Sequence, residues 1–347
     1  MPKSEKQRKL DRLVEKLRND DFDYVPREKK DINWSKYDDA QINEMNDMLL
    51  LIRDTVDESA RRLDLDIEKP EGRGRPPLPA ADLAKAVLIQ QYFDVANRTT
   101  AGLVLLFEEK MGFERPFSYK SVERAYEDPR VVAILNEVFD MTQEPVSDKE
   151  SSFAPDGTGL PISMKKNWES EGDGDDHEGY DYMVGMAGTT YGIYSAVEFP
   201  KNPNAHESPF FEPLLQRTAA HYSSIDLVSG DSAFLARDNC DLVIEAGGIP
   251  RFYPKKGITL KRKGSWAWTE MLLDFIENPQ QWLREYHTRS NVESGFSTFK
   301  RHFLSPLRKC IGRRRKTETF ARACDYNLKR ASYIRRQEGL TAPWMAA

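Results

Sequence analysis

The sequence predicts an α/β fold, with a mixed sheet flanked by helices and a helical region before it. Short apolar segments have the length and composition of strands, and a glycine turn joins two of them as a hairpin. Helix and strand patterns then alternate before a long helical pattern, which is typical of a mixed sheet covered by helices. The strand patterns lie at 153–156, 182–186, 193–199, 225–228, 242–244 and 251–253, and the helix patterns at 211–222, 280–304 and 317–337.

The region before the sheet divides at a linker. Residues 1–71 are charged and helical in pattern, and we expect the first ~30 to be disordered because chain ends are rarely tied down. Residues 72–79, GRGRPPLP, form the linker, since three prolines exclude a helix or an inner strand. Several short helices follow over 80–148, and they suit a helix-turn-helix DNA-binding domain and a plain packing domain about equally. The α/β domain then spans 149–305, and a basic helical C-terminal segment spans 306–347.

Composition excludes several classes of protein. There is no apolar run long enough to cross a membrane and no secretory signal, and three cysteines without a C-x-x-C motif exclude a disulfide scaffold or a zinc finger. We therefore expect a cytoplasmic protein with no membrane partner. The formal net charge of −5 hides an uneven distribution, because residues 300–347 hold 13 Lys and Arg against 3 Asp and Glu.

The long helical pattern carries a narrow polar line. Tyr286, Arg289, Glu293 and Lys300 fall on one face at ~100° per residue, beside an apolar stripe that begins at Val292. Such a line would aim charged groups at the edge of a core, where a site can form. The alternative is a solvated face on which Arg289 and Glu293 form an i,i+4 ion pair.

Two aspartates follow strand patterns. Asp156 and Asp231 each end an apolar segment, and ligands bind at the carboxyl ends of strands in open α/β sheets. One such aspartate is usually a turn or cap residue. Two of them together with Glu293 suit a divalent cation, because Mg²⁺ prefers hard oxygen ligands.

These residues resemble the signature of a large branch of the DDE insertion-sequence transposases. The pattern Y-x2-R-x3-E-x6-K is present as Tyr286, Arg289, Glu293 and Lys300, and Asp156 and Asp231 look like the first two catalytic acids of that family. The resemblance implies a ribonuclease-H-like catalytic domain over 149–305, with Asp156, Asp231 and Glu293 as catalytic residues and metal ligands. One departure is visible, since many relatives have His-Asp where this chain has His206-Glu207.

The resemblance also implies cofactors and partners. It points to two Mg²⁺ ions, with Mn²⁺ as a substitute, and to DNA cleavage with strand transfer. The expected partners are double-stranded DNA, as the terminal inverted repeats of the element and its target, and a second copy of the chain in a DNA-bound synaptic complex. The protein would then be associated with the nucleoid.

Basic residues supply the expected DNA contacts. Arg289 would bind phosphates through two parallel hydrogen bonds, and Lys300 would attract them as a point charge. Tyr286 could contact DNA or pack in the core. The cations from Lys300 to Lys316 indicate backbone binding, with a solvated face as the alternative. Arg73 and Arg75 match a minor-groove hook, a motif with many false matches. The cations of the C-terminal run are Lys300, Arg301, Arg308, Lys309, Arg313, Arg314, Arg315 and Lys316.

Three functions stay open on the sequence alone. The leading one is an insertion-sequence transposase that cuts and joins DNA. The second is a catalytically silent DNA-binding protein descended from a transposase. The third is a ribonuclease-H-like nuclease that cuts nucleic acid without strand transfer.

Overall fold

The computed structural model describes residues 3–26, 32–65, 77–162, 180–202, 204–303 and 306–345. Arg73, Arg75 and residues 72–76 of the predicted linker lie outside these ranges. The chain forms two compact units, each of which is described below by itself. The first comprises Met1–Asp31, Ser147–Thr158 and Val184–Ser297, and the second Ile32–Val146, Gly159–Met183 and Thr298–Ala347. These units cut across the five predicted segments, because residues before 32 belong with the sheet and the C-terminal segment belongs with the N-terminal helices.

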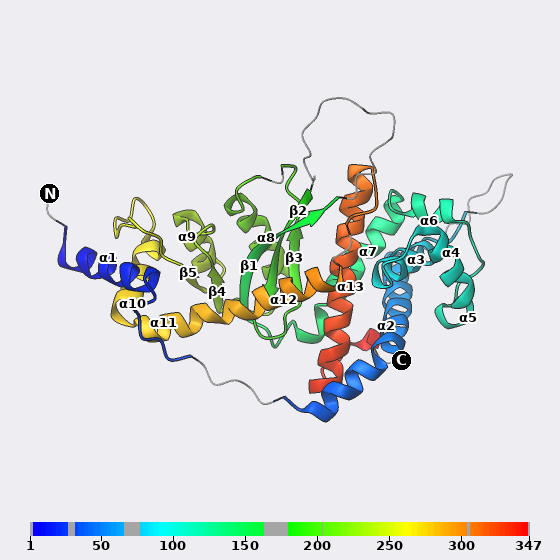
Figure 1. Ribbon diagram of the computed structural model, residues 1–347, viewed down its shortest axis with the longest axis horizontal. Helices are drawn as coiled ribbons and strands as arrows, with labels where there is room; N and C mark the ends of the chain where they lie inside the picture. Colours follow the sequence, from blue (N-terminus) through cyan, green and yellow to red (C-terminus); the bar gives the residue numbers. More distant parts are fainter. Residues whose placement is uncertain are drawn as a thin grey trace. The chain divides into compact units, whose positions relative to one another are not determined.

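A five-stranded mixed sheet has the strand order β3-β2-β1-β4-β5 (Figure 1). The central strand β1 runs parallel to β4, which runs parallel to β5, whereas β2 and β3 pair antiparallel. This arrangement confirms the predicted mixed α/β fold and agrees with the ribonuclease-H-like architecture that the resemblance implies. The strands are β1 (Ser152–Pro161), β2 (Tyr180–Gly188), β3 (Tyr194–Glu198), β4 (Leu227–Gly230) and β5 (Ile249–Phe252).

A buried carboxylate holds the turn between β2 and β3. Glu150 accepts hydrogen bonds from the backbone N–H groups of Thr190 and Tyr191, at 2.8 and 2.9 Å, and from that of Ser152. Gly188 permits this approach, since a Cβ there would lie 2.4 Å from a carboxylate oxygen of Glu150. Burial raises the pKa of Glu150, and the three N–H donors partly offset that rise.

Helices of the first unit pack on the sheet and on one another. The helix α8 contacts β3, and α10 and α11 contact β5. Aromatic side chains fill the core, with Phe211 against Phe252 and Phe275 against Trp282. The helices are α1 (Glu5–Arg18), α8 (Phe211–His221), α9 (Arg237–Glu245), α10 (Trp266–Glu277) and α11 (Pro279–Tyr286), followed by the first residues of α12 (Ser290–His302).

Two predictions for this unit were wrong. Residues 5–18, expected to be disordered, form α1, because Ser4 caps the helix and Leu10 and Val14 are buried where α1 packs on α10. Residues 242–244, expected to be a strand, lie in α9. That helix buries Cys240 and Val243 three residues apart on one face, and a short apolar run does not distinguish such a helix from a strand.

The second unit is helical. The C-terminal helix α13 packs along α2, α3 and α7 (Figure 1). Its α3 is buried on every side from Ala80 to Gln91, so this helix serves packing. None of the helices in the described part of the chain is long and apolar enough to span a membrane. The helices are α2 (Trp34–Arg62), α3 (Ala80–Tyr92), α4 (Asn97–Leu106), α5 (Glu108–Met111), α6 (Tyr119–Ala125), α7 (Pro129–Met141) and α13 (Gly312–Glu338).

A fully buried ion pair lies on α13. Arg322 donates to Glu318 at 3.1 Å, to Gln91 at 2.9 Å and to the carbonyl of Phe303 at 3.1 Å. Glu318 also accepts the backbone N–H of Arg308 at 3.0 Å, which ties the preceding segment to the helix.

Removing Glu318 is expected to destabilise this unit strongly. Glu318→Ala leaves the guanidinium of Arg322 buried without its counter-ion, and breaking a buried pair in this way costs about 3–5 kcal/mol. Urea unfolding of the variant measures that loss. Glu338→Ala, an exposed change at the end of the same helix, is the control and should cost less than about 0.5 kcal/mol. Equal losses for the two variants would contradict the prediction.

Candidate active site

Asp156 and Asp231 lie at matching positions on neighbouring parallel strands. Ser152 of β1 pairs with Leu227 of β4, and each aspartate lies four residues beyond its member of that pair. Asp156 is within β1, whereas Asp231 follows the last residue of β4. The parallel register therefore brings the two carboxylates close together, as predicted, but the expectation that Asp156 ends its strand was wrong, because β1 continues to Pro161.

Arg289 lies among three carboxylates. Its Nη2 is 3.9 Å from Asp156 Oδ1 and 3.9 Å from Asp231 Oδ2, and its Nη1 donates to Glu293. The side chain of Arg289 is 12% exposed, those of Asp156 and Asp231 are 24% and 38% exposed, and that of Glu293 is 48% exposed. The three acids thus converge from a strand, a turn and a helix on one guanidinium at the protein surface.

The charges of this cluster act on one another. Burial raises the pKa of Asp156 to about 6, although the positive charge of Arg289 opposes this shift. The negative charges of Glu207 and Asp231 add to the rise. Arg289 Nε is buried and finds no hydrogen-bond acceptor among the described residues.

The donor set suits a divalent cation. Three carboxylates offer the hard oxygen ligands that Mg²⁺ prefers, and they already surround a positive charge. Within the described ranges no three His, Cys, Asp or Glu side chains stand closely enough to hold a metal ion as they are. In this structure the single positive charge of Arg289 partly offsets the charges of the three acids.

The chain is similar to known proteins over most of its length. Residues 148–328, over half of the chain, match the family model described as "Transposase DDE domain". The chain belongs to the DDE transposase family. It is also similar to an Archaeoglobus fulgidus protein named "Probable transposase for insertion sequence element ISA1214", with 24% identity over 333 residues, 94% of each chain. The resemblance seen in the sequence is confirmed.

The helix that carries the signature of this transposase is interrupted. The sequence predicted one helix over 280–304, but α11 ends at Tyr286, a 3-10 turn spans His287–Arg289, and α12 begins at Ser290. Thr288 and Ser290 donate side-chain hydrogen bonds to carbonyls three residues back, at 2.9 and 2.8 Å, and such bonds compete with regular helix geometry. Of the residues of the predicted polar line, only Glu293 and Lys300 therefore lie on one continuous helix, α12.

Tyr286 lies in the core beside the acids. It is buried, and its ring lies 5.6 Å from that of Trp282 and 5.1 Å from that of Tyr253. Burial raises the pKa of Tyr286 to about 12, and the charges of Arg289 and Asp231 also act on it. Of the two roles considered, core packing is the one that these contacts support.

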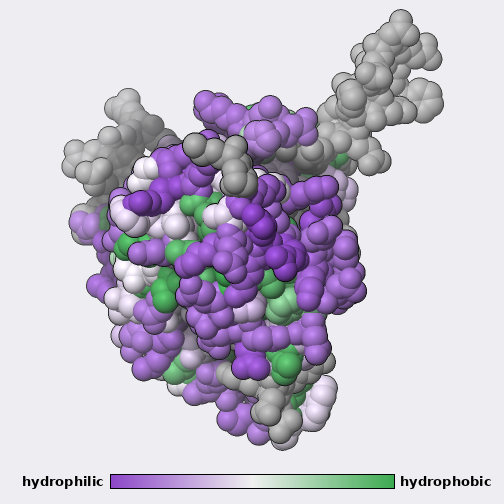
Figure 2. All heavy atoms as spheres, turned by 90° about the vertical axis from the view of Figure 1, so that its left-hand side faces the viewer, coloured by the Kyte–Doolittle hydropathy of each residue, from purple (hydrophilic) through white to green (hydrophobic). Residues whose placement is uncertain are grey.

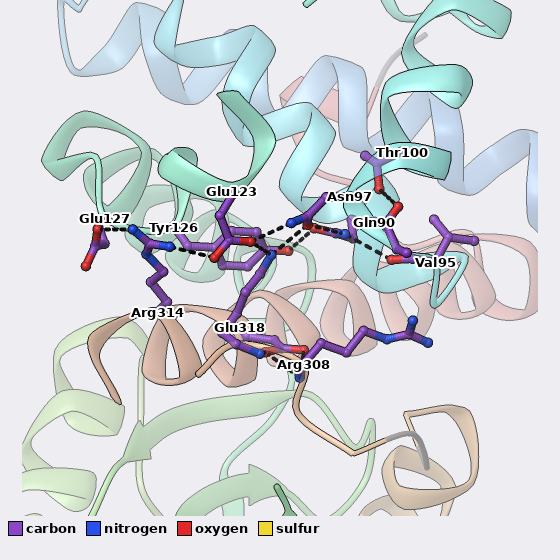
Figure 3. A network of polar contacts seen from close by, with 12 residues as sticks. Gln90, Val95, Asn97, Thr100, Glu123, Tyr126, Glu127, Arg308, Arg314 and Glu318 are labelled. Atoms are coloured by element: carbon purple, nitrogen blue, oxygen red, sulfur yellow. Dashed lines mark hydrogen bonds and ion pairs between the residues drawn. The ribbon is translucent and has the colours of Figure 1, made fainter. Parts of the chain in front are cut away.

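The remaining cations of the signature and the C-terminal run belong to the second unit. Lys300, on α12, and Arg301, Arg308, Arg313 and Lys316 are exposed. Several cations of the run are paired with acids. Lys309 bonds Glu123 at 2.8 Å. Arg314 bonds Glu123 and Glu127 at 2.6 and 2.7 Å (Figure 3). Arg315 bonds Asp181 at 2.8 Å and Arg308 bonds Asp94 at 3.0 Å.

Sequence reasoning gave too little weight to Glu207. The departure from His-Asp left its role in doubt, yet its charge contributes to the raised pKa of Asp156. It precedes the short 3-10 helix Ser208–Phe210 that leads into α8. The signal that could have found it was the pair His206-Glu207 itself, which precedes the helix α8.

The raised pKa of Asp156 predicts a pH-dependent stability. The folded pKa of about 6 exceeds the ordinary value of 3.8, so the wild type loses stability as pH rises between these values. Without metal, Asp156→Asn should be more stable than the wild type at pH 8, by at most about 3 kcal/mol, and equally stable at pH 3.5. Urea unfolding in EDTA at both pH values tests this. A stability difference independent of pH would contradict the assignment.

Proposed function

We propose that this protein cuts and joins DNA at the ends of an insertion sequence, with Asp156, Asp231 and Glu293 holding two Mg²⁺ ions. Mn²⁺ would substitute. The observation that carries the proposal is the convergence of these acids on one guanidinium. Their partial exposure leaves them open to a ligand, unlike an ion pair of the core such as Glu318 and Arg322.

The acids and the cations of the site would have different roles. When bound, paired metal ions supply a nucleophile at neutral pH and neutralise charge on the phosphate. The three carboxylates would hold these ions from a rigid strand, a turn and a helix. Arg289, whose guanidinium lies among the three acids, would donate to phosphate oxygens beside the cut. Lys300 lies seven residues after Glu293 on α12, close to two helical turns further along the same face, and would add a positive charge.

Transposition requires both ends of an element, so the active form would be a homodimer on double-stranded DNA. The test is to incubate the purified protein with Mg²⁺ and duplexes that carry the ends of its own element, and to follow cleavage and joining. Paired end cleavage followed by joining is the expected result. Binding without cutting would support a silent DNA-binding protein instead, and cutting without end specificity would support a nuclease.

A further inference from the structure

A second basic surface lies in the first unit, on the loop between β5 and α10. We call residues 255–263 the basic loop. It contains no acid, and its five cations are all exposed. None of the five forms an ion pair with an Asp or Glu that the structure describes. These cations are Lys255, Lys256, Lys261, Arg262 and Lys263.

The C-terminal run differs in this respect. Lys309 is buried and Arg314 half-buried, and they are paired with Glu123 and Glu127, while Arg315 is paired with Asp181. Cations that already have counter-ions must break those pairs before they can bind phosphate. The cations of the basic loop have no such ion pairs to break among the described residues. The loop is therefore the stronger candidate for binding a polyanion.

The basic loop is held in place through its backbone. Arg237 donates to the carbonyls of Lys261 and Arg262, both at 2.9 Å, and Trp268 Nε1 donates to the carbonyl of Thr259 at 2.8 Å. Ile258 is buried beneath the loop. The apolar side of the loop is thus anchored and its charged side faces solvent, which lowers the entropy lost when it binds a ligand.

An aromatic ring stands beside these charges. Trp266 is 63% exposed, and the guanidinium carbon of Arg262 lies 3.4 Å from the centroid of its ring. Stacking on the ring orients a guanidinium whose edge can still donate to phosphate oxygens. Figure 2 shows that the face of the first unit that carries α1, α9 and α10 is covered mostly by hydrophilic residues.

The basic loop starts from the edge of the sheet that carries the acids. The strands β4 and β5 are parallel, so their carboxyl ends share one edge, and Tyr253 N–H donates to the carbonyl of Gly230 at 3.0 Å. Asp231 is the residue after Gly230, and the basic loop begins two residues after Tyr253. The start of this loop therefore lies close to Asp231.

We propose that the basic loop binds the phosphate backbone of the DNA that enters the acid site. This inference rests on the proposed function, because the shared edge favours DNA over an acidic protein. Contacts of this kind are independent of base sequence and depend on salt, since each neutralised phosphate releases counter-ions.

The test is the salt dependence of binding to a duplex carrying an element end, measured in EDTA so that nothing is cut. The variant Lys261→Ala/Arg262→Ala/Lys263→Ala keeps the anchoring bonds, because these use backbone carbonyls. Its log–log salt slope should be shallower by ~0.9 for each phosphate that the variant no longer neutralises. The matched control Lys149→Ala/Lys201→Ala/Arg284→Ala removes the same charge from scattered exposed positions of the same unit and should keep the wild-type slope.

The outcomes separate the two proposals. If the wild type does not bind the duplex, the proposed function fails and this inference fails with it. If the wild type binds and the loop variant keeps the wild-type slope, only the inference is overturned. An equal decrease of the salt slope in both triple variants would also overturn the inference, since the slope would then depend only on the net charge of the protein. Should the loop variant misfold by circular dichroism, Lys255→Gln/Lys256→Gln, at the other end of the loop, provides the same measurement.

Discussion

Replacing Glu293 by glutamine is expected to abolish DNA cleavage while leaving DNA binding nearly unchanged. Glutamine keeps the size of the side chain but loses the charge that a metal ligand needs. A bound metal stabilises the transition state by several kcal/mol, and each 1.36 kcal/mol is a factor of ten, so the rate should fall on the order of 10³-fold or more. Glu293 is 48% exposed and pairs with Arg289, so the fold should tolerate the change.

The measurement compares end cleavage in Mg²⁺ with duplex binding in EDTA for the same preparations. Glu245→Gln, an exposed change on α9, serves as the control and should match the wild type in both assays. A Glu293→Gln variant that cuts at the wild-type rate would remove Glu293 from the site. Loss of binding together with cleavage would instead indicate a DNA contact.

Most strands could be predicted from the sequence because they contain short apolar runs bounded by turn residues, but β1 continues beyond its apolar run, from Asp156 to Pro161. Phe153 and Val228 lie in buried segments of this kind, and both were placed in strands. The sequence did not distinguish the helix α9 from a strand, because its apolar residues include a run of three, 242–244. The docking of α1 was also invisible, since Leu10 and Val14 are buried by α10, which lies over 250 residues further along the chain.

The acids of the candidate site were likewise visible in the sequence, whereas the contacts around them were not. Asp156 and Asp231 each end a strand pattern, which predicts that their carboxylates lie near each other, although Asp156 lies within β1 and only Asp231 follows its strand. Arg289, which lies among all three acids, is the last residue of a 3-10 turn at which Thr288 and Ser290 donate side-chain hydrogen bonds to the backbone, and the sequence did not predict this turn.

The pairing of cations with acids could not be predicted from the sequence either. The acids that neutralise Lys309 and Arg314 lie nearly two hundred residues earlier in the chain, so a count of charge along the C-terminal run overstated what is free to bind DNA. The basic loop, by contrast, has its five cations within nine residues, and that cluster could have been recognised from the sequence.

Replacing Asp231 by cysteine is expected to exchange the metal preference of the site. A thiolate is a softer ligand than a carboxylate and suits Mn²⁺ better than Mg²⁺. The variant should therefore be inactive in Mg²⁺, again by on the order of 10³-fold, and partly active in Mn²⁺. Asp226→Cys, an exposed change just before β4 in the same sheet, should behave as the wild type in both metals.

Asp231 has a second role that the experiment must separate from metal binding. Its Oδ1 accepts the backbone N–H of Ala233 at 2.8 Å, while its Oδ2 faces Arg289 at 3.9 Å. Asp231→Asn can keep the turn bond and loses only the charge, so its stability in urea reports whether the turn survives without a carboxylate. Mn²⁺ binding to each metal-free variant, followed by electron paramagnetic resonance, should persist in the Cys variant and weaken in the Asn variant. Full Mg²⁺ activity in the Cys variant would show that Asp231 is a turn residue only, because a direct ligand cannot change from oxygen to sulfur without changing the preferred metal.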